Sequence, residues 1–395
     1  MKTITLSDVS VNGRGYYGIG ASAVPFSDDL YTYLRITDIN DDGTLNMADL
    51  KSVDDEKACE YLLQPNDIVF ARTGASTGRN YFYDGSDGKF VYAGFLIKFS
   101  IDPSKINPKY VKYFCLSQQY KDWIHSFNTG STRGNINAQT LGKMPIPELE
   151  RVKQDALVEI LSSIDAKIKQ NNAINENLEQ QAQAYFQELF VDNADPEWTT
   201  GTISDLGTVV GGSTPSKAKP EYYTETGIAW ITPKDLSINK SKFVSHGEND
   251  ITELGLKNSS ATIMPEGTVL FSSRAPIGYI AIAAGEVTTN QGFKSVVPKS
   301  EVGTPFVYFF LKNTLPVIEG MASGSTFKEV SGSTMKNVPA VIPDAETLAK
   351  FSDFCAPIFA QQHILEGQNQ SLATLRDNLL PKLMSGEIDV SAVHL

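Results

Sequence analysis

The sequence has few of the residues that build metal sites or disulfide frameworks. Its 395 residues include four histidines and three scattered cysteines, Cys59, Cys115 and Cys355. Neither residue type has the spacing of zinc ligands, and an odd cysteine count argues against a disulfide framework. No apolar run approaches the roughly 18 residues that a membrane-spanning helix needs, and the first residues lack the apolar stretch of a secretory signal. We therefore expect a reduced, cytoplasmic protein without a metal site.

Motifs for nucleotide binding and catalysis are missing as well. The sequence has no phosphate-binding loop of the form G-x-x-x-x-G-K-S/T, and its histidines have no matching placement beside a Ser or Cys nucleophile. Gly13–Gly18 fits G-x-G-x-x-G, but the residues after it are a poor helix, so a surface loop is the favoured interpretation. Asn107–Tyr110 resembles a methyltransferase Asn-Pro-Pro-aromatic motif that lacks its second proline, and a helix start is favoured. The sequence predicts a chain without catalytic residues.

Positive charge is scarce in this chain. The chain has 34 Lys and Arg against 46 Asp and Glu, a net charge of −12, which taken alone argues against a nucleic-acid partner. The excess is unevenly distributed, because segments 151–195 and 343–395 together hold 7 basic and 15 acidic residues. The rest of the chain is nearly neutral, and a neutral module can still present a basic face.

The sequence does contain an internal repeat, in which several short segments of the first half recur in the second half with an offset of about 200 residues. This period is too long for a stacked repeat of roughly 20–50 residues, so it indicates one module used twice, to grip two copies of something or two ends of one thing. The recurring segments are Leu6–Val9 and Ile203–Leu206, Ile36–Asp38 and Ile231–Pro233, Pro65–Gly78 and Pro265–Gly278, and Gly130–Thr132 with Met144–Pro145 against Gly324–Thr326 with Val338–Pro339.

Both modules are predicted to be mixed and rich in strands. Short β-branched and aromatic runs bounded by Gly, Asp and Asn are typical of strands, and a proline in the first turn marks one helix in each module, Pro108–Tyr120 and Pro305–Leu315. The expected strands cover 68–70, 81–83, 90–92, 95–97, 268–271, 279–282 and 295–297. The expected order is a first module over 1–148, a helix over 149–195, a second module over 196–342 and a second helix over 343–395.

The segment after each module has the pattern of a long coiled-coil helix. Residues 152–190 contain neither Gly nor Pro, and their apolar positions step by four and three. The second segment has a similar stripe, although Pro357 and Gly367 predict a late start or a kink. The first predicted seam is Leu157, Leu161, Ile164, Ile168, Asn171, Asn175, Leu178, Ala182, Tyr185 and Leu189, and the second is Phe351, Phe354, Ile358, Gln361, Leu365, Gln368, Leu372, Leu375 and Leu379.

These helices define the predicted fold class, which is α+β. A helix of about 38 residues is roughly 57 Å long at 1.5 Å per residue, which exceeds the diameter of one module, so we expect it to pack on its copy. Packing of each helix on its own module alone is the alternative. The order module–helix–module–helix predicts two tandem mixed α/β modules, separated by an antiparallel coiled coil and related by a pseudo-two-fold axis.

Two pairs of recurring loops are the candidate binding elements. The loop at Arg72–Arg79 and its counterpart Ser272–Gly278 each combine arginine, hydroxyls and glycine, and a second pair begins at Thr129 and Ser323. Arginine suits guanine edges and phosphates, asparagine suits adenine, and hydroxyls suit phosphates. Ordinary surface turns are the alternative. The candidate DNA contacts are Arg72, Thr73, Ser76, Arg79, Thr132, Arg133, Asn135, Asn137, Ser272, Ser273, Arg274, Ser325, Thr326 and Lys328.

Together, these features resemble the specificity subunit of type I DNA restriction–modification enzymes. The resemblance covers essentially the whole chain and is clearest in the second module, while the first module lacks the glycine-rich and Trp-Ile-Thr runs. Such divergence fits two modules that read different sequences. The residues that carry the resemblance are Trp198, Gly211–Pro215, Ile228–Leu236, Ser272–Gly278 and Leu375–Ile388.

The resemblance implies a division of labour. Each module would be a target recognition domain for one half of a bipartite double-stranded DNA site, and the coiled coil would set the spacer between the halves. The helices would also dock two methyltransferase subunits carrying S-adenosylmethionine, and restriction subunits using ATP and Mg²⁺ can join them. No cofactor is then expected in this chain. The residues expected to pair the helices or dock partners are Leu157, Leu161, Ile164, Ile168, Asn171, Asn175, Leu178, Tyr185, Ile358, Leu365, Leu372, Leu375 and Leu379.

Two other interpretations stay open at this point. The first is a stand-alone methyltransferase or nuclease whose motifs are unrecognisable, and the second is a coiled-coil scaffold that does not bind DNA. Methyl transfer without any partner would favour the first. The acidic net charge keeps the second in play, and a salt-dependent complex with duplex DNA would exclude it.

Overall fold

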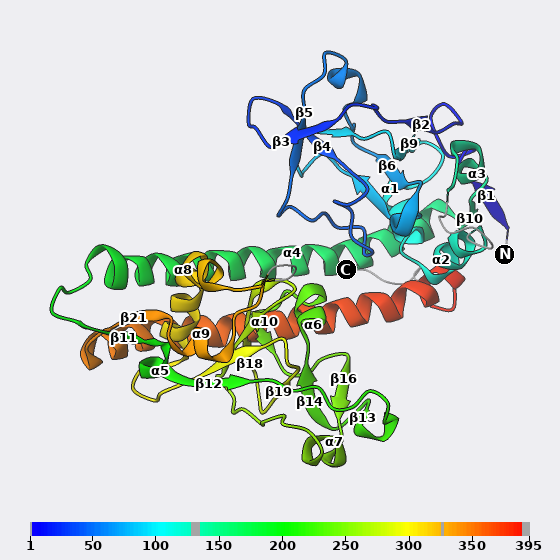
Figure 1. Cartoon of the computed structure of the whole chain (residues 1–395). Coiled ribbons are helices and arrows are strands. Elements are labelled where there is room, and N and C mark those ends of the chain that lie inside the picture. The colour runs from blue at the N-terminus through cyan, green and yellow to red at the C-terminus, as the bar shows by residue number, and fades with distance from the viewer. Residues whose placement is uncertain (1, 128–134, 325–327, 389–395) are drawn as a thin grey trace. The chain divides into compact units, whose positions relative to one another are not determined.

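The structure is a computed structural model that describes residues 2–127, 135–324 and 328–388. It divides into two compact units, one made of residues 1–167 with 372–395 and the other of residues 168–371. Helices α4 (Arg151–Gln187) and α10 (Ala345–Ser385) belong to both units, so each unit holds one repeated module and a segment of each helix (Figure 1).

The first unit contains two four-stranded sheets and a short two-stranded one. The strand orders are β2-β9-β6-β7, β3-β5-β4-β8 and β1-β10. Apart from α4 and α10, its elements are β1 (Thr3–Thr5), β2 (Tyr16–Tyr17), β3 (Ala23–Pro25), β4 (Tyr31–Leu34), β5 (Lys51–Val53), β6 (Asp67–Ala71), β7 (Asn80–Tyr83), β8 (Phe90–Tyr92), β9 (Leu96–Ser100), α1 (Pro108–Phe114), α2 (Gln118–His125), α3 (Ala138–Gly142) and β10 (Pro145–Pro147).

The second unit has the same sheets with additions. The strand orders are β12-β20-β17-β18-β15, β13-β16-β14-β19 and β11-β21. Its elements are β11 (Thr199–Thr202), α5 (Ile203–Leu206), β12 (Gly207–Gly211), β13 (Tyr223–Thr224), β14 (Ile228–Ile231), α6 (Pro233–Ile238), β15 (Phe243–Val244), β16 (Asn249–Ile251), α7 (Glu253–Lys257), β17 (Val269–Ser273), β18 (Ile277–Ala283), β19 (Thr288–Thr289), β20 (Lys294–Pro298), α8 (Thr304–Met321), α9 (Gly332–Lys336) and β21 (Pro339–Ile342).

The sheets of the two units match strand for strand, which confirms the duplication. In each unit the strand that follows the first polar turn pairs antiparallel with the last strand of its sheet, as β2 with β9 and β12 with β20. One parallel pairing also recurs, β4 with β8 and β14 with β19. The second unit adds β15 to the sheet of β17 and β18. A repeated sequence pattern therefore corresponds to a repeated topology.

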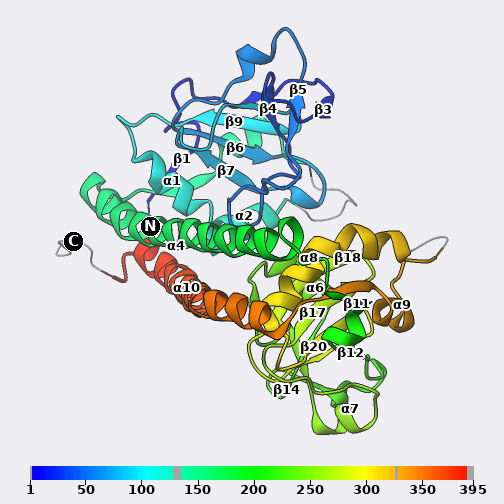
Figure 2. The same cartoon turned by 90° about the vertical axis from the view of Figure 1, so that its left-hand side faces the viewer.

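Alternation along the central strands separates two apolar layers in each unit. In β6, Ile68 and Phe70 face a cluster that contains α1 and the helix pair, while Val69 faces the other four-stranded sheet. In β17, Val269 and Phe271 likewise contribute to the cluster with α8, which Figure 2 shows beside β17 and β18. This is the two-residue period of a strand buried on both faces.

Within each unit, segments of α4 and α10 pair antiparallel. In the first unit, Leu157 and Leu161 of α4 share a buried cluster with Leu380 and Leu383 of α10. In the second unit, residues later in α4 meet residues earlier in α10: the Asn171 Nδ2 donates to Asn369 Oδ1 at 2.9 Å, and Tyr185 packs on Phe351. The helices also pack on their modules, so both predicted kinds of packing occur together.

The seam of α4 is confirmed, but the seam of α10 needs a correction. The predicted positions Phe354, Gln361, Gln368 and Leu375 are exposed, and Leu375 keeps 47% of its surface accessible. Two of them still contact α4 at the edge of the seam, because Phe354 lies against Tyr185 and Gln368 Oε1 accepts from Asn171 Nδ2 at 3.4 Å. The buried or inward positions are each one residue later, at Cys355, Gln362, Asn369 and Arg376. The predicted Ile358, Leu365, Leu372 and Leu379 hold. The reason is that spacings of three and four are both compatible with one helix face, so the stripe admits two registers.

Helix boundaries differ from expectation where local capping decides. Pro108–Tyr120 is two helices, because Ser117 caps α2 by accepting from Tyr120 N and donating to Phe114 O. Helix α8 is longer than predicted and continues through Pro316. Helix α10 begins at Ala345 and includes both Pro357 and Gly367, so the predicted late start is wrong. Asn107 caps α1 by accepting from Lys109 N, as a helix start requires.

Candidate nucleic-acid interface

A close approach between two backbones builds the same corner in each unit. A Cβ on Gly18 would lie 2.2 Å from Tyr92 O, and a Cβ on Gly212 would lie 1.9 Å from Asn290 O. Both positions therefore require glycine. The carbonyl of the next residue is held by an aromatic side chain, since Tyr33 Oη donates to Ile19 O and Trp230 Nε1 donates to Ser213 O, both at 2.9 Å.

This corner accounts for two sequence motifs. Gly13–Gly18 does not lead into a helix, because Tyr16 and Tyr17 form β2, and Gly18 is the close-approach glycine. The Gly211–Pro215 run supplies the equivalent residue, Gly212, and Tyr223 Oη then fixes Pro215 O at 2.6 Å. Gly18 and Gly212 are present for packing, and the segment predicted to be a surface loop includes strand β2, which pairs with β9.

An aspartate caps the next loop of each unit. The Asp38 carboxylate accepts from Arg35 N and from the Arg35 guanidinium, and the Asp235 carboxylate accepts from Thr232 N and Thr232 Oγ1. Asp38 therefore corresponds to Asp235. The sequence comparison had aligned Ile36–Asp38 with Ile231–Pro233, which is two residues out of register. The hydrogen bonds of Asp38 and Asp235 therefore give the correct alignment of the two modules here, and the short sequence similarity between Ile36–Asp38 and Ile231–Pro233 gave a wrong one.

The loop after β6 and β17 shows a second shift of register. Arg72 N donates to Phe95 O at 3.0 Å and Ser273 N donates to Gly292 O at 2.7 Å. Arg72 O in turn accepts from Ile136 N, and Ser273 O accepts from Val330 N, both at 2.9 Å. Arg72 is thus equivalent to Ser273, and Thr73 is equivalent to Arg274. We call this recurring set of backbone hydrogen bonds the loop frame. The two arginines occupy neighbouring positions of the loop frame, not the same position.

Two of the predicted DNA contacts are buried and support the loop instead. Ser272 and Ser273 each have 0% of their surface exposed. Ser272 Oγ donates to Pro276 O at 2.8 Å and accepts from Tyr279 N, and Ser273 Oγ donates to Gly292 O at 3.0 Å. These hydroxyls have no access to a ligand in this conformation, so we reassign them from DNA contact to holding the Ala275–Pro276 tip.

The arginines of the first module differ in how far they are engaged. Arg79 is held by Asp41, with Nε to Oδ1 at 2.7 Å and Nη2 to Oδ2 at 3.2 Å, and it also donates to Ile39 O. Arg72 lies over the ring of Tyr17 at 5.0 Å, and its buried Nε has no hydrogen-bond partner among the described residues. Arg72 is the better candidate for a ligand contact.

The remaining candidates of the first module gather beside Arg72. Thr73 pairs across an isolated bridge with Asn135, which is exposed. The Asn137 side chain accepts from Thr140 N at 2.8 Å as the cap of α3, which leaves its amide nitrogen at the surface. Ser76 is half-buried in the short helical turn of the loop. Thr132 and Arg133 lie outside the described residues.

In the second module, Arg274 is only lightly held. Its Nη1 lies 3.5 Å from Glu329 Oε2, and that carboxylate is shared with Lys294 Nζ at 3.8 Å. Burial lowers the pKa of Lys294, and Glu329 opposes that shift. Both contacts are long, so an acceptor that the Arg274 guanidinium can engage at short, bidentate distance, such as phosphate or a guanine edge, can replace Glu329. Lys328 is exposed, and Ser325 and Thr326 lie outside the described residues.

Arg274 borders a hollow of about 500 Å³ that lies within the second module. The hollow also receives Lys217 and Gln291 from two loops and Lys234 from the first turn of α6. Its charge is mixed, because Lys234 pairs with Glu248 at 2.5 Å. A concave site with basic, amide and hydroxyl groups suits a polar, anionic ligand.

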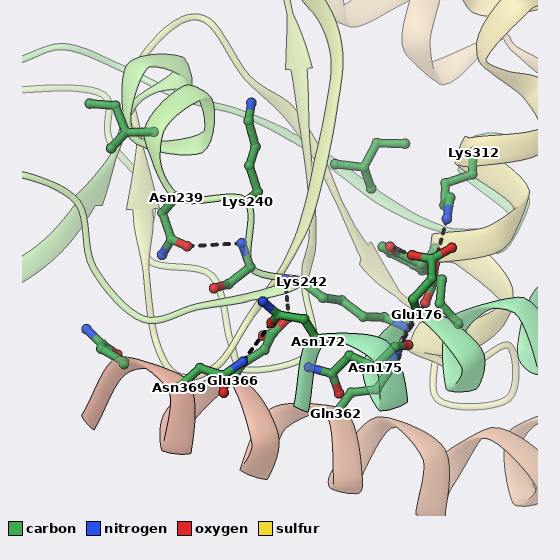
Figure 3. A pocket seen from close by; sticks show the side chains of 16 residues that line it. Asn172, Asn175, Glu176, Asn239, Lys240, Lys242, Lys312, Gln362, Glu366 and Asn369 are labelled. Carbon is green, nitrogen blue, oxygen red and sulfur yellow. Dashed lines mark hydrogen bonds and ion pairs between the residues drawn. The ribbon is translucent and has the colours of Figure 1, made fainter. Parts of the chain in front are cut away.

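A second hollow of about 880 Å³ lies in the second unit along α4, α8 and α10 (Figure 3). Lys242 is buried there, with Nζ 2.8 Å from Glu179 Oε2 and 3.5 Å from the centre of the Phe359 ring. Lys312 Nζ reaches the other Glu179 oxygen at 2.5 Å, and Gln362 Oε1 accepts from Lys242 at 2.9 Å. The network joins both helices to the module.

The pKa values of both charged partners of this network are lowered, but for different reasons. Burial would raise the pKa of Glu179, but Lys242 and Lys312 outweigh it and lower the pKa to about 2. Burial lowers the pKa of Lys242 to about 8 against the attraction of Glu179. Burial also raises the pKa of Glu366, whose carboxylate accepts from Lys242 N and Phe243 N. Because these groups satisfy one another, the network is structural.

Within 2–127, 135–324 and 328–388, no group of three or more His, Cys, Asp or Glu side chains is arranged to hold a metal ion. Over the same ranges, no helix has the length and apolar character to cross a membrane.

The fold and the loop frame define a duplicated protein with one polar, loop-built edge per module and a helix pair shared by both units. The family model for the type I restriction modification DNA specificity domain matches residues 28–180 and 196–379. The chain belongs to this family.

Similarity to individual proteins agrees with the family. The chain is 40% identical over 190 residues to the type I restriction enzyme MjaIX specificity subunit of Methanocaldococcus jannaschii, a match that covers 46% of this chain and 44% of that protein. It is 21% identical to the HindI specificity subunit of Haemophilus influenzae, covering 91% of this chain and 96% of that protein. A crystal structure of a type I restriction–modification S subunit from M. genitalium shares the fold, with a TM-score of 0.57 at 18% identity and coverage of 97% and 95%.

Several residues of the interface were missed by sequence reasoning. Tyr17, Phe95, Lys217 and Gln291 surround the predicted arginines but lie in segments with no recurring side chain. The Gly212 motif was recognised, but the meeting of Lys217 and Arg274 at one hollow depends on contacts distant in sequence. The usable signal was the glycine itself, because a glycine that recurs beside a strand marks a close approach of backbones.

Proposed function

We propose that this chain is the non-catalytic DNA-specificity subunit of a type I restriction–modification complex. Each module reads one half of a bipartite, asymmetric site in double-stranded DNA. The observation that carries the proposal is the loop frame. Equivalent backbone hydrogen bonds hold the arginine-bearing loop in both modules, but the side chains that these loops present differ. The first module presents Arg72 over Tyr17, and the second presents Arg274, one position further along, at a hollow that Lys217 also lines. Two modules that recognise different half-sites need the same backbone arrangement and different base-contacting side chains.

Affinity and selectivity then come from different groups. Arginine can make a bidentate contact with O6 and N7 of guanine, worth ~1–3 kcal/mol of discrimination, and asparagine or glutamine does the same with adenine. Backbone N–H groups and hydroxyls position the phosphates. The acidic total charge is no obstacle, since 15 of the 46 carboxylates lie in segments 151–195 and 343–395, away from these loops in sequence.

The helix pair is the proposed ruler and docking element. Each base pair adds ~3.4 Å to the length of a DNA duplex. Modules held at a fixed separation would therefore recognise half-sites separated by a fixed spacer. A pseudo-two-fold arrangement would present both modules to one duplex. Two methyltransferase subunits would dock on the helices and supply S-adenosylmethionine chemistry, and restriction subunits would supply ATP and Mg²⁺ chemistry. The chain itself would bind none of these cofactors.

The test uses the chain assembled with its methyltransferase subunits. Specific binding to the DNA site, determined first by methylome sequencing of the host, is compared for the native chain, Arg274→Ala and Lys257→Ala. Lys257 is an exposed lysine of α7 that serves as a charge-matched control. We expect Arg274→Ala to lose ~1–3 kcal/mol of specific binding and Lys257→Ala to bind like the native complex.

Three results would count against the proposal. Unchanged methylation at unchanged sites in Arg274→Ala would remove that residue from the interface. Methyl transfer by the purified chain alone would favour a stand-alone enzyme. Failure of the assembled complex to bind duplex DNA in a salt-dependent way would leave a coiled-coil scaffold.

A further inference from the structure

A four-residue turn recurs at the same place in both modules. In the first module it joins β8 to β9, with Leu96 N donating to Ala93 O at 2.8 Å; in the second it joins β19 to β20, with Phe293 N donating to Asn290 O at 3.2 Å. The two central positions are Gly94–Phe95 and Gln291–Gly292. Each turn therefore carries one glycine and one long side chain, in opposite order.

The turn is bonded directly to the arginine-bearing loop. The carbonyl of Phe95 accepts from Arg72 N, and the carbonyl of Gly292 accepts from Ser273 N, the residue before Arg274. Gln291 also lines the same hollow as Arg274. The long side chain of each turn thus begins beside the main candidate reader of its module.

Neither long side chain is used by the fold. Phe95 keeps 60% of its surface exposed, although burial of a phenylalanine normally stabilises a protein. Gln291 is exposed, and its amide has no hydrogen-bond partner within the residues that the structure describes. A single exposed apolar residue needs no explanation by itself; here it lies in the same turn as the unpartnered side-chain amide of the second module, at the neighbouring position.

We propose that this turn carries a specificity-determining residue in each module, Phe95 in the first and Gln291 in the second. The inference rests on the proposed function and names the chemistry of that site. Phe95 makes an apolar contact with the 5-methyl group of thymine in the major groove. Gln291 pairs bidentately with N6 and N7 of adenine. Both contacts follow from what these side chains can offer to base edges.

The test measures DNA binding by the chain assembled with its methyltransferase subunits, on duplexes that carry the experimentally determined site. Phe95→Ala and Gln291→Ala are compared with two matched controls, Met47→Ala in the first module and Gln180→Ala on α4, both exposed. We expect a loss of about 10-fold in specific affinity for each turn variant and none for either control, with unchanged thermal unfolding in all four.

Base analogues separate contact from indirect effects. Replacing thymines of the first half-site by uracil, which lacks the methyl group, should weaken the native complex and leave Phe95→Ala unaffected. Replacing adenines of the second half-site by 7-deazaadenine, which lacks N7, should do the same for the native complex and Gln291→Ala.

Outcomes divide the two hypotheses. Specific binding by the native complex together with unchanged affinity and unchanged analogue response in both turn variants would overturn this inference alone. Absence of specific DNA binding by the native complex would overturn the proposed function, and this inference with it.

Discussion

The Glu179–Lys242 pair predicts an asymmetry between two substitutions that look equivalent. Glu179→Gln removes a carboxylate that accepts from Lys242 at 2.8 Å, from Lys312 at 2.5 Å and from Tyr308 at 3.1 Å. Lys242→Met removes an ammonium but leaves Lys312 and Tyr308 to satisfy the carboxylate. The two variants delete the same ion pair but leave different groups behind.

The magnitudes follow from the pKa values. The pKa of Glu179 falls from 4.5 to about 2 on folding, which corresponds to ~3 kcal/mol in favour of the charged form. Glu179→Gln should therefore lower the free energy of unfolding by ~3 kcal/mol, because Lys242 is left buried without its carboxylate. The pKa of Lys242 falls from 10.5 to about 8, so folding disfavours its charge, and Lys242→Met should cost less than half as much.

Urea unfolding of the full chain, followed by tryptophan fluorescence, measures both changes. Trp198 and Trp230 report on the second unit. Glu176→Gln and Lys240→Met are matched controls at exposed positions close in sequence, and both should stay within ~0.5 kcal/mol of the native chain. An equal or larger loss for Lys242→Met than for Glu179→Gln would refute the reasoning.

Two further predictions concern pH and glycine. Because the folded pKa of Glu179 lies below its unfolded value of 4.5, its stabilisation is complete above that pH and is lost as the pH falls toward 2; Glu179→Gln should therefore show a shallower loss of stability over this window in thermal unfolding scans. Gly212→Ala should destabilise the chain and abolish binding to the second half-site, because the added Cβ would lie 1.9 Å from Asn290 O. Gly367→Ala should raise the free energy of unfolding by ~0.5–1 kcal/mol, because the Cβ added to this residue of α10 would meet open space. A stable, binding-competent Gly212→Ala would show that the backbones at this corner can separate.

The large features of the fold could be predicted because they repeat or are long. The duplication was visible in four recurring segments, and the α4 seam extends over a helix of 37 residues, so individual errors average out. The α10 seam failed in alternate positions because Phe354 and Cys355 are both apolar and either fits the stripe. In the structure Cys355 is the fully buried residue of the two. Phe354 lies at the rim of the seam against Tyr185, with ring centroids 4.5 Å apart.

The candidate site could be predicted only in outline. The loop at Arg274 was found from its composition, but the burial of Ser272 and Ser273 depends on bonds to Pro276 and Gly292 that no local pattern encodes. The pairing of Arg79 with Asp41 joins residues 38 positions apart. Composition identifies which loops are polar; tertiary contacts decide which of their side chains remain available.

The two modules also show how one frame can acquire two specificities. The contacts that fix the frame are made by backbone groups or by residues with a constrained structural role, such as Gly18 and Gly212 or Asp38 and Asp235. Under the proposed function, the side chains that differ between the modules, Phe95 against Gly292 and Thr73 against Arg274, contribute little to these contacts. Substitution of a reader then costs little stability, whereas substitution of a frame residue costs the fold. Specificity can diverge between the copies for that reason, while the sheet topology stays the same.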